Sequence, residues 1–165
     1  MSGVVAWFTG LPSSGKSTLA AEVAGELRLR GIAAVTLDSD EVRAAIVPPH
    51  GYDDEGRAAL YATLANLATV IARQGHAVLV PATAHRRAFR DHARALAPQF
   101  LEIFVDTPLE ECKRRDAKGL YAAGGALVPG IGIPYEPPLA PDLVARPDDD
   151  GFANVIAQRI ADLTD

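Results

Sequence analysis

Residues 4–20 read VVAWFTGLPSSGKSTLA, and the rest of the chain can be understood from this stretch. It begins with VVAWFT, a run of apolar and β-favouring residues that predicts a strand buried on both faces of a parallel sheet. The pattern G-x-x-x-x-G-K-[ST] follows, with its defining residues at Gly10, Gly15, Lys16 and Ser17. The next segment, STLAAEVAGELRLR, predicts an amphipathic helix that ends at Gly31. Strand, glycine loop and helix therefore come in the order that a phosphate-binding loop requires.

The spacing of this motif suits anion binding, whereas a chance Gly-Lys turn would not explain the strand in front of it. Glycines let the backbone curl so that successive N–H groups point at phosphate oxygens, above the positive end of the helix dipole. Lys16 is placed to reach the β- and γ-phosphates, and the Ser17 hydroxyl to bind Mg²⁺. ATP and Mg²⁺ are the expected cofactors. The loop residues expected to bind them are Gly10, Pro12, Ser13, Ser14, Gly15, Lys16, Ser17 and Thr18.

The composition limits the class of protein. A length of 165 residues with 48% hydrophobic residues suits one domain with a real core, which we expect to span residues 1–165. The formal net charge of −5 argues against a nucleic-acid partner. The lone Cys112 suits a reducing compartment, and the apolar start is too short for a signal peptide or a membrane span. We therefore expect a cytoplasmic protein without a membrane partner.

Two carboxylates follow the next predicted strand, residues 33–37 (AAVTL), in the sequence Asp38-Ser39-Asp40. The carboxyl ends of strands are where open α/β sheets hold their active sites. Such a pair can hold Mg²⁺, directly or through water, and can accept a proton from an attacking hydroxyl. Asp38 is the expected metal ligand beside Ser17, and Lys16, Asp38 and Asp40 are the expected catalytic residues. The alternative role is structural, with Asp40 capping a helix that begins at the next residue.

Residues on the following helices are expected to bind an acceptor molecule. Arg43 either faces the same cleft, where it would bind an anionic group, or lies on the surface. A helix is predicted from residue 53 or 54 to about residue 74, and Tyr52 and Arg57 at its start are expected to line the acceptor pocket. The helical spacing predicts a core-facing side formed by Leu60, Leu64, Leu67, Val70 and Ile71.

A third buried strand, residues 77–81 (AVLVP), leads into the segment ATAHRR at the same edge of the sheet. Thr83, His85 and Arg86 are therefore expected to contact the acceptor. A basic helix face follows, formed by Arg86, Arg87, Arg90 and Arg94. This face is either solvated surface or, for its first members, a reader of the charge on a phosphorylated acceptor.

The last third of the chain contains two more predicted strands, residues 101–105 and 143–146, and a C-terminal helix over residues 151–163. Between the strands a helix follows DTPLE, and then comes KGLYAAGGALVPGIGIPYEPP, which has no helical or strand period. We expect residues 117–138 to form a mobile lid that excludes water in a kinase. The alternative is a disordered connector, although Tyr121 and Tyr135 favour a segment that docks.

Strands that alternate with helices predict an α/β fold of three layers, a parallel sheet of about five strands with helices on both faces. With the glycine loop, this is the architecture of a small P-loop kinase. A nucleotide switch or a non-catalytic nucleotide-binding module is the alternative. The sequence Asp53-Asp54-Glu55-Gly56 does spell D-x-x-G, but it begins a helix, and no N-K-x-D guanine motif is present. The carboxylate pair and the lid favour phosphoryl transfer to an acceptor.

The chain resembles the adenylylsulfate kinase (APS kinase) family from residue 4 to about residue 143. The motifs that carry the resemblance are GLPSSGKSTLA, LDSDEVR, FLEIFVDTPLEECKRRDAKGLY and GIGIPYEPP. The resemblance implies phosphorylation of the 3′-hydroxyl of adenosine 5′-phosphosulfate by MgATP, and a possible homodimer. It also implies that Arg43, Tyr52 and Arg57 bind the phosphosulfate nucleotide. Arg115 is implied near the ATP adenine, and Lys118 and Leu120 at the base of the lid beside the substrate.

The chain departs from the family pattern on the acceptor side. Leu60 stands where the family has an Asn, and Thr83-Ala84-His85-Arg86-Arg87 replaces I-S-P-[FY]-R. The lid lacks its usual basic residues and has Val128-Pro129 before the Gly-Ile pair. Two interpretations follow: an adenylylsulfate kinase in which His85 and Arg86 replace the lost contacts, or a related kinase for another nucleotide or small anionic hydroxyl acceptor.

Overall fold

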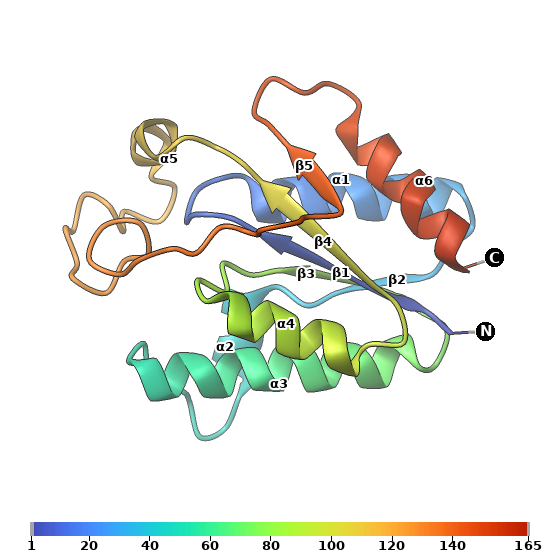
Figure 1. Cartoon of the computed structure of the whole chain (residues 1–165), viewed down its shortest axis with the longest axis horizontal. Coiled ribbons are helices and arrows are strands. Elements are labelled where there is room, and N and C mark those ends of the chain that lie inside the picture. The colour runs from blue at the N-terminus through green and yellow to red at the C-terminus, as the bar shows by residue number, and fades with distance from the viewer. Residues whose placement is uncertain (1, 165) are drawn as a thin grey trace.

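The structure is a computed structural model that describes residues 2–164. These residues contain a five-stranded parallel sheet in the order β2-β3-β1-β4-β5 (Figure 1). The strands are β1 (Val4–Thr9), β2 (Ala34–Thr36), β3 (Ala77–Pro81), β4 (Phe100–Val105) and β5 (Leu143–Ala145). The helices are α1 (Lys16–Leu29), α2 (Ser39–Ala45), α3 (Asp54–Ala72), α4 (Arg87–Leu96), α5 (Leu109–Arg115) and α6 (Phe152–Thr164). The expected α/β fold is confirmed.

Strand β1 occupies the centre of the sheet because it is apolar on both faces. It pairs in parallel with β3 on one side and β4 on the other. Val4, Ala6 and Phe8 point into one core, and Val5 and Trp7 into the other, so every residue of the strand is buried. The phosphate-binding motif, which follows directly, is thereby fixed at the middle of the carboxyl edge of the sheet.

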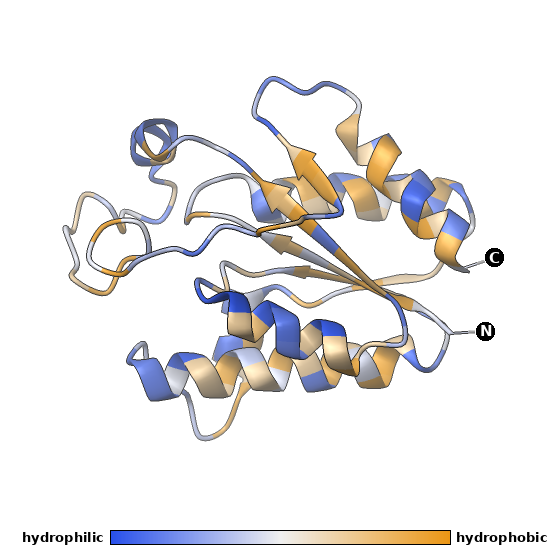
Figure 2. Ribbon diagram, in the orientation of Figure 1, coloured by the Kyte–Doolittle hydropathy of each residue, from blue (hydrophilic) through white to orange (hydrophobic). Residues whose placement is uncertain are grey.

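The two faces of the sheet are covered by different helices. Helices α1 and α6 pack on one face, and α3 and α4 on the other, which gives three layers (Figure 1). The hydropathy colouring shows the apolar residues concentrated along the strands, while much of the outer surface of α4 is hydrophilic (Figure 2). This arrangement confirms the prediction of helices on both faces. None of the helices within residues 2–164 combines the length and the apolarity needed to cross a bilayer.

The buried side of α3 differs in part from the expected one. Leu60 and Leu64 are buried as expected, but Leu67 is 41% exposed and Val70 is 56% exposed. Every fourth residue from Leu60 onward lies in the core, and the later members of this row are alanines, Ala68 and Ala72. Small side chains let the helix pack closely, so leucine and valine positions were a poor guide to its inner face.

The helix that follows β2 is capped by a different carboxylate from the one considered in the sequence. Asp38 is the N-cap of α2, and its side chain accepts a hydrogen bond from the Asp40 backbone N–H at 2.9 Å. Asp40 lies inside the first turn. The alternative in which Asp40 caps this helix is therefore wrong, and the Asp40 carboxylate remains available for other contacts.

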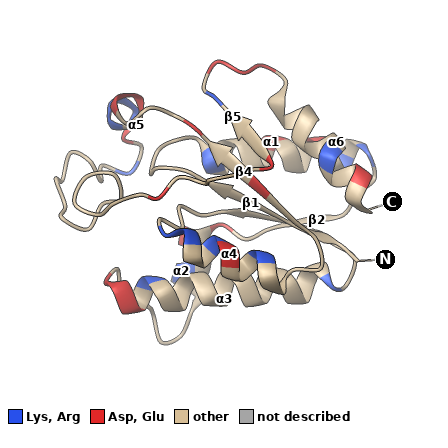
Figure 3. Cartoon of the chain, in the orientation of Figure 1, with Lys and Arg blue, Asp and Glu red and all other residues tan. Residues whose placement is uncertain are grey.

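The basic face predicted on α4 is not uniformly exposed. Arg90 is 1% exposed and pairs with Glu102 of β4, with 3.0 Å between Nε and Oε2. Glu102 is the acidic residue of β4 (FLEIFV), and Figure 3 shows red within the otherwise tan central strands. Arg86 instead pairs with Asp54 at 3.3 Å on the surface. Arg86 and Arg90 are four residues apart, yet Arg86 is on the surface and Arg90 is buried, because Arg90 lies against the sheet.

Residues 117–138 contain no helix or strand, as the Gly- and Pro-rich sequence predicts. This segment, which we call the lid segment, nevertheless contacts the body of the protein. The Tyr121 hydroxyl donates to the Pro12 carbonyl at 2.7 Å, and the Tyr135 hydroxyl lies 2.8 Å from Thr9 Oγ1. Both tyrosines therefore dock, one at each end of the segment.

Two glycine substitutions should affect stability in opposite directions. A Cβ at Gly56 in α3 would lie 2.3 Å from the Gly51 carbonyl oxygen, so Gly56→Ala should reduce the free energy of unfolding by about 1–3 kcal/mol. A Cβ at Gly25 in α1 meets no atom within 4 Å, so Gly25→Ala should add about 0.5–1 kcal/mol through helix propensity. Urea unfolding followed by circular dichroism measures both. Effects of the same sign would contradict the packing described for α3.

Candidate functional site

A cleft of about 310 Å³ lies beside the phosphate-binding loop at the carboxyl edge of the sheet. It brings together most of the residues singled out in the sequence, from five separate parts of the chain. These are Pro12, Ser13, Gly15, Lys16, Ser17, Thr18, Asp40, Arg43, Tyr52, Arg57, Thr83, Arg115, Lys118 and Leu120. Tyr61 also lines the cleft, although the sequence analysis placed no functional residue there. The sequence did contain one indication of this position, because Tyr61 lies one helical turn after Arg57.

The loop between β1 and α1 has the backbone geometry of an anion site. Gly15, the N-cap of α1, has φ of 101°, and a Cβ at Gly10 would lie 2.6 Å from the Val105 carbonyl oxygen. Both positions therefore require glycine. The first turn of α1 contains no acidic residue and no side-chain cap, so the positive end of its dipole is uncompensated. Ser14 Oγ is buried without a hydrogen-bond partner among the described residues.

Lys16 is held close to this loop. Its ammonium donates to the carbonyl oxygens of Leu11 at 2.8 Å and Gly10 at 3.1 Å. Burial, and then the neighbouring charge of Lys118, lower the pKa of Lys16 from 10.5 to about 7. A polyphosphate would reverse this shift, since its negative charge favours the ammonium form.

Ser17 and Asp38 form a pair of oxygen ligands next to the loop. The Ser17 hydroxyl donates to Asp38 Oδ2 at 2.7 Å, and Asp38 is fixed in place as the cap of α2. The described residues contain no group of three or more His, Cys, Asp or Glu side chains that could form a metal site alone. The oxygen atoms of Ser17 and Asp38 fit Mg²⁺, which usually takes only one or two protein ligands and completes its shell with phosphate and water.

Asp40 forms an ion pair with Lys118 across the cleft. Both side chains are about half exposed, at 50% for Asp40 and 57% for Lys118, so they are in contact with solvent. The pair connects the start of α2 to the beginning of the lid segment. A carboxylate at this place can orient a hydroxyl and accept its proton.

A cation and aromatic cluster forms the other end of the cleft. The guanidinium carbon of Arg43 lies 4.0 Å from the centroid of the Tyr52 ring, and that of Arg57 lies 5.9 Å from it. Arg57 also donates to the Tyr52 carbonyl at 2.8 Å and to the Leu127 carbonyl of the lid segment at 2.6 Å. These two arginines give this end of the cleft a positive charge that suits an anionic ligand.

His85 and Arg86 do not line the cleft, contrary to the expectation that they contact an acceptor. His85 is 1% exposed and packs edge-on against Tyr61 and Phe89, with ring centroids 6.3 and 5.5 Å apart. Burial, helped by the charge of Arg57, lowers the pKa of His85 to about 4, so it is neutral at pH 7. The preceding Ala84 has φ of 44°, a sharp turn that the sequence did not indicate.

The base of the lid segment is bound to the phosphate-binding loop. Arg115 donates to the Ser14 carbonyl at 3.3 Å, and the Ala117 backbone N–H donates to Ser13 Oγ at 3.2 Å. Arg115 is oriented by Glu111, whose Oε1 accepts from its Nε at 3.0 Å. Residues at and just after the end of α5 therefore contact the phosphate-binding loop, while the implied place of Arg115 near the ATP adenine stays a prediction.

The fold and the cleft together define a P-loop phosphotransferase. A model of the family described as adenylylsulphate kinase matches residues 2–146. The chain belongs to this family.

Known proteins of this kind are similar to the chain over most of its length. An adenylyl-sulfate kinase of Synechococcus sp. (strain JA-2-3B'a(2-13)) is 41% identical over 148 residues, which is 87% of this chain and 85% of that protein. The bifunctional enzyme CysN/CysC of Mycobacterium tuberculosis is 42% identical over 154 residues, but the chain spans only 25% of its length. The structure of the Mycobacterium tuberculosis APS kinase CysC in complex with AMPPNP and APS has a TM-score of 0.87 and 39% identity, covering 98% of this chain and 97% of that one.

The lowered pKa of Lys16 should make stability depend on pH. Between about pH 7 and 10.5 the folded chain binds fewer protons at Lys16 than the unfolded chain does, so this residue's contribution to the free energy of unfolding rises with pH. Wild type should therefore gain stability relative to Lys16→Met between pH 6.5 and pH 9. Urea unfolding of both proteins measures the difference. Lys113→Met, at an exposed lysine of α5, is the matched control and should show no such trend. A pH-independent difference for Lys16→Met would refute the shift.

Proposed function

We propose that this chain transfers the γ-phosphoryl group of ATP to the 3′-hydroxyl of adenosine 5′-phosphosulfate and forms 3′-phosphoadenosine 5′-phosphosulfate. The observation that carries the proposal is a single cleft lined by the phosphate-binding loop, by Asp40, and by Arg43 and Arg57. Membership in the family supports the choice of acceptor. The related Mycobacterium tuberculosis structure, described as a complex with AMPPNP and APS, supports it as well.

On the donor side, the loop residues and Arg115 bind ATP. The backbone N–H groups of the loop and the ammonium of Lys16 neutralise the phosphate oxygens, where negative charge develops during transfer. Ser17 and Asp38 would hold Mg²⁺, the former directly and the latter directly or through water. When bound, Mg²⁺ supplies positive charge to the phosphates and fixes their orientation. Arg115 lies where it can cover the nucleotide, since it contacts the loop through Ser14.

On the acceptor side, Asp40 is the proposed base. Its carboxylate orients the acceptor hydroxyl in line with the γ-phosphoryl group and accepts its proton. Lys118, now paired with Asp40, is close enough to bind an anionic group of the acceptor instead. Arg43 and Arg57 bind the phosphosulfate charge, and Tyr52, Thr83 and Leu120 complete the walls. When it binds, the acceptor replaces contacts between cleft residues, such as the Asp40–Lys118 ion pair, by charge-assisted hydrogen bonds to the acceptor itself.

The lid segment, residues 117–138, serves to exclude water from the reaction in this proposal. Water in the cleft would compete with the acceptor hydroxyl for the phosphoryl group. The segment contacts the phosphate-binding loop through Tyr121 and the acceptor side through the Leu127 carbonyl, so it spans both halves of the cleft. The whole of residues 1–165 acts as a single kinase domain, and a homodimer, expected from the family resemblance, belongs to the same proposal.

The direct test is product formation. The purified chain should convert ATP and adenosine 5′-phosphosulfate to equal amounts of ADP and the 3′-phosphorylated nucleotide, in a reaction that requires Mg²⁺. The matched control is the acceptor analogue without a 3′-hydroxyl, which should give no product. Turnover with another hydroxyl compound but none with adenosine 5′-phosphosulfate would overturn the acceptor. Absence of ATP consumption with every acceptor would overturn the kinase.

Asp40→Asn should separate chemistry from nucleotide binding. The amide cannot accept the proton, so kcat should fall by about 10²- to 10⁴-fold while the affinity for ATP, measured by calorimetry, stays close to that of wild type. Glu41→Gln, on the same helix and exposed, removes an equal charge outside the cleft and should leave kcat unchanged. Wild-type turnover by Asp40→Asn would eliminate this residue as the base.

A further inference from the structure

The wall of the cleft at Thr83 is held by two buried side chains that do not themselves line the cleft. Thr9, the last residue of β1, donates its hydroxyl to the Thr83 carbonyl at 2.7 Å. Arg90 of α4 donates to the carbonyl of the next residue, Ala84, at 2.6 Å. Ala84 has φ of 44°, which is uncommon for a residue with a side chain. The backbone of this wall therefore keeps its turn through contacts with β1 and α4.

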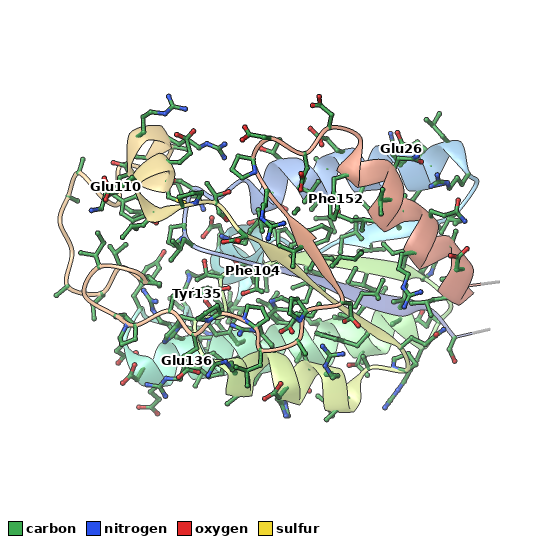
Figure 4. All side chains as sticks on the ribbon, turned by 45° about the horizontal axis from the view of Figure 1, so that its top comes forward. Glu26, Phe104, Glu110, Tyr135, Glu136 and Phe152 are labelled. Carbon is green, nitrogen blue, oxygen red and sulfur yellow. The ribbon has the colours of Figure 1, made fainter. Side chains whose placement is uncertain are left out.

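The same two side chains also hold the chain where the lid segment ends. The Tyr135 hydroxyl lies 2.8 Å from Thr9 Oγ1, and Arg90 donates to the Glu136 carbonyl at 2.6 Å. Tyr135 stacks on Phe104 of β4, with ring centroids 6.3 Å apart (Figure 4). Residues 134–137 and the wall at Thr83 are thus connected twice, once through Thr9 and once through Arg90.

The directions of the hydrogen bonds at Thr9 follow from its single hydroxyl proton. The Thr83 carbonyl can only accept, so Thr9 must donate to it. Thr9 then has no proton left for Tyr135, and the Tyr135 hydroxyl must be the donor to Thr9 Oγ1. The result is an ordered chain of two hydrogen bonds from Tyr135 through Thr9 to Thr83.

The Thr9 and Arg90 side chains of this network are buried and do not line the cleft. Thr9 is 0% exposed, and Arg90 is 1% exposed and neutralised by Glu102. A parallel set of contacts joins the same two segments, since the Glu136 backbone N–H donates to the His85 carbonyl at 2.8 Å and the Glu136 carboxylate accepts from the Arg87 backbone N–H at 2.8 Å (Figure 4). Fully paired buried groups of this kind restrict the positions of the segments they join.

We propose that Thr9 and Tyr135 are positioning residues for the acceptor. They link residues 134–137, where the lid segment ends, to the cleft wall at Thr83. A change in the position of the lid segment therefore changes the position of the wall that faces the acceptor. The inference rests on the proposed function, because it assigns the wall at Thr83 to acceptor binding. The ATP end of the cleft is held separately, through Tyr121 and Arg115, and is not part of this link.

Steady-state kinetics with adenosine 5′-phosphosulfate test the link. Tyr135→Phe removes one hydrogen bond and should raise the acceptor KM about three- to tenfold, with kcat and the KM for ATP within about twofold of wild type. Thr9→Val keeps the shape and removes the hydroxyl, and with it the bonds to Thr83 and Tyr135 and the 3.5 Å contact from Arg90, so its effect should be at least as large. The double variant should match Thr9→Val, because the Tyr135 hydroxyl then has no partner to lose. Thr9→Ser restores the hydroxyl and should return the acceptor KM toward wild type.

Thr69→Val is the matched control, since it also removes a buried hydroxyl but from a place on α3 that makes no hydrogen bond to the described residues. It should leave both KM values unchanged. An unchanged acceptor KM in Thr9→Val and Tyr135→Phe would overturn the inference. An equal rise in both KM values would overturn it too, because that pattern indicates general loosening.

Hydrogen exchange provides a readout that needs no turnover. Without any ligand, Tyr135→Phe and Thr9→Val should speed amide exchange in residues 82–86 about tenfold and leave residues 10–17 unchanged. This measurement separates the two proposals. Exchange that stays at the wild-type rate refutes the link even if the chain is an active kinase. Faster exchange supports the link even if adenosine 5′-phosphosulfate is not the acceptor.

Discussion

The burial of β1 on both faces is the constraint on which the rest of the structure depends. A strand with apolar side chains on both faces is stable only in the middle of a sheet, where helices cover it above and below. Its end then falls between β3 and β4, and the chain leaves the sheet through Gly10, where a Cβ would meet the Val105 carbonyl. The phosphate-binding loop, the ends of β2 and β3 and the lid segment meet at this edge because β1 fixes its position.

Local charge in the cleft is independent of the charge of the whole chain. The formal net charge is −5, yet Lys16, Arg43, Arg57 and Lys118 line a single cleft. Burial and then the charge of Lys118 lower the pKa of Lys16. Such a cleft gains stability from a bound polyanion, since each cation then acquires a partner. The net charge argued against a nucleic-acid-binding surface, but it gave no information about this site.

The elements that sequence could predict were those decided by local pattern, namely the apolar strands, the glycine loop and the irregular lid segment. The errors came from contacts between distant residues. Arg90 was placed on a basic surface because its partner, Glu102, lies on another element and is itself inside a strand. His85 was predicted to lie in the cleft because the turn at Ala84, with φ of 44°, could not be foreseen from an alanine. This turn changes the direction of the chain just before His85. Helical spacing likewise did not show that the later turns of α3 pack through Ala68 and Ala72, with Leu67 exposed.

Two of the departures from the family pattern that raised the question of another acceptor lie behind the cleft. Leu60 and His85 are each 1% exposed, and both pack in the core beneath the acceptor end, so neither side chain can contact a ligand in the described arrangement. The proposed acceptor-binding residues that line the cleft include Arg43, Tyr52 and Arg57, which follow the pattern. A substitution behind the cleft wall acts by shifting the backbone of the wall, as the contacts of Ala84 illustrate. Such a shift changes the affinity for a ligand more readily than it changes which charged group or hydroxyl is recognised. In the proposed function, the affinity for the acceptor therefore depends on the position of the Thr83 wall relative to the two arginines.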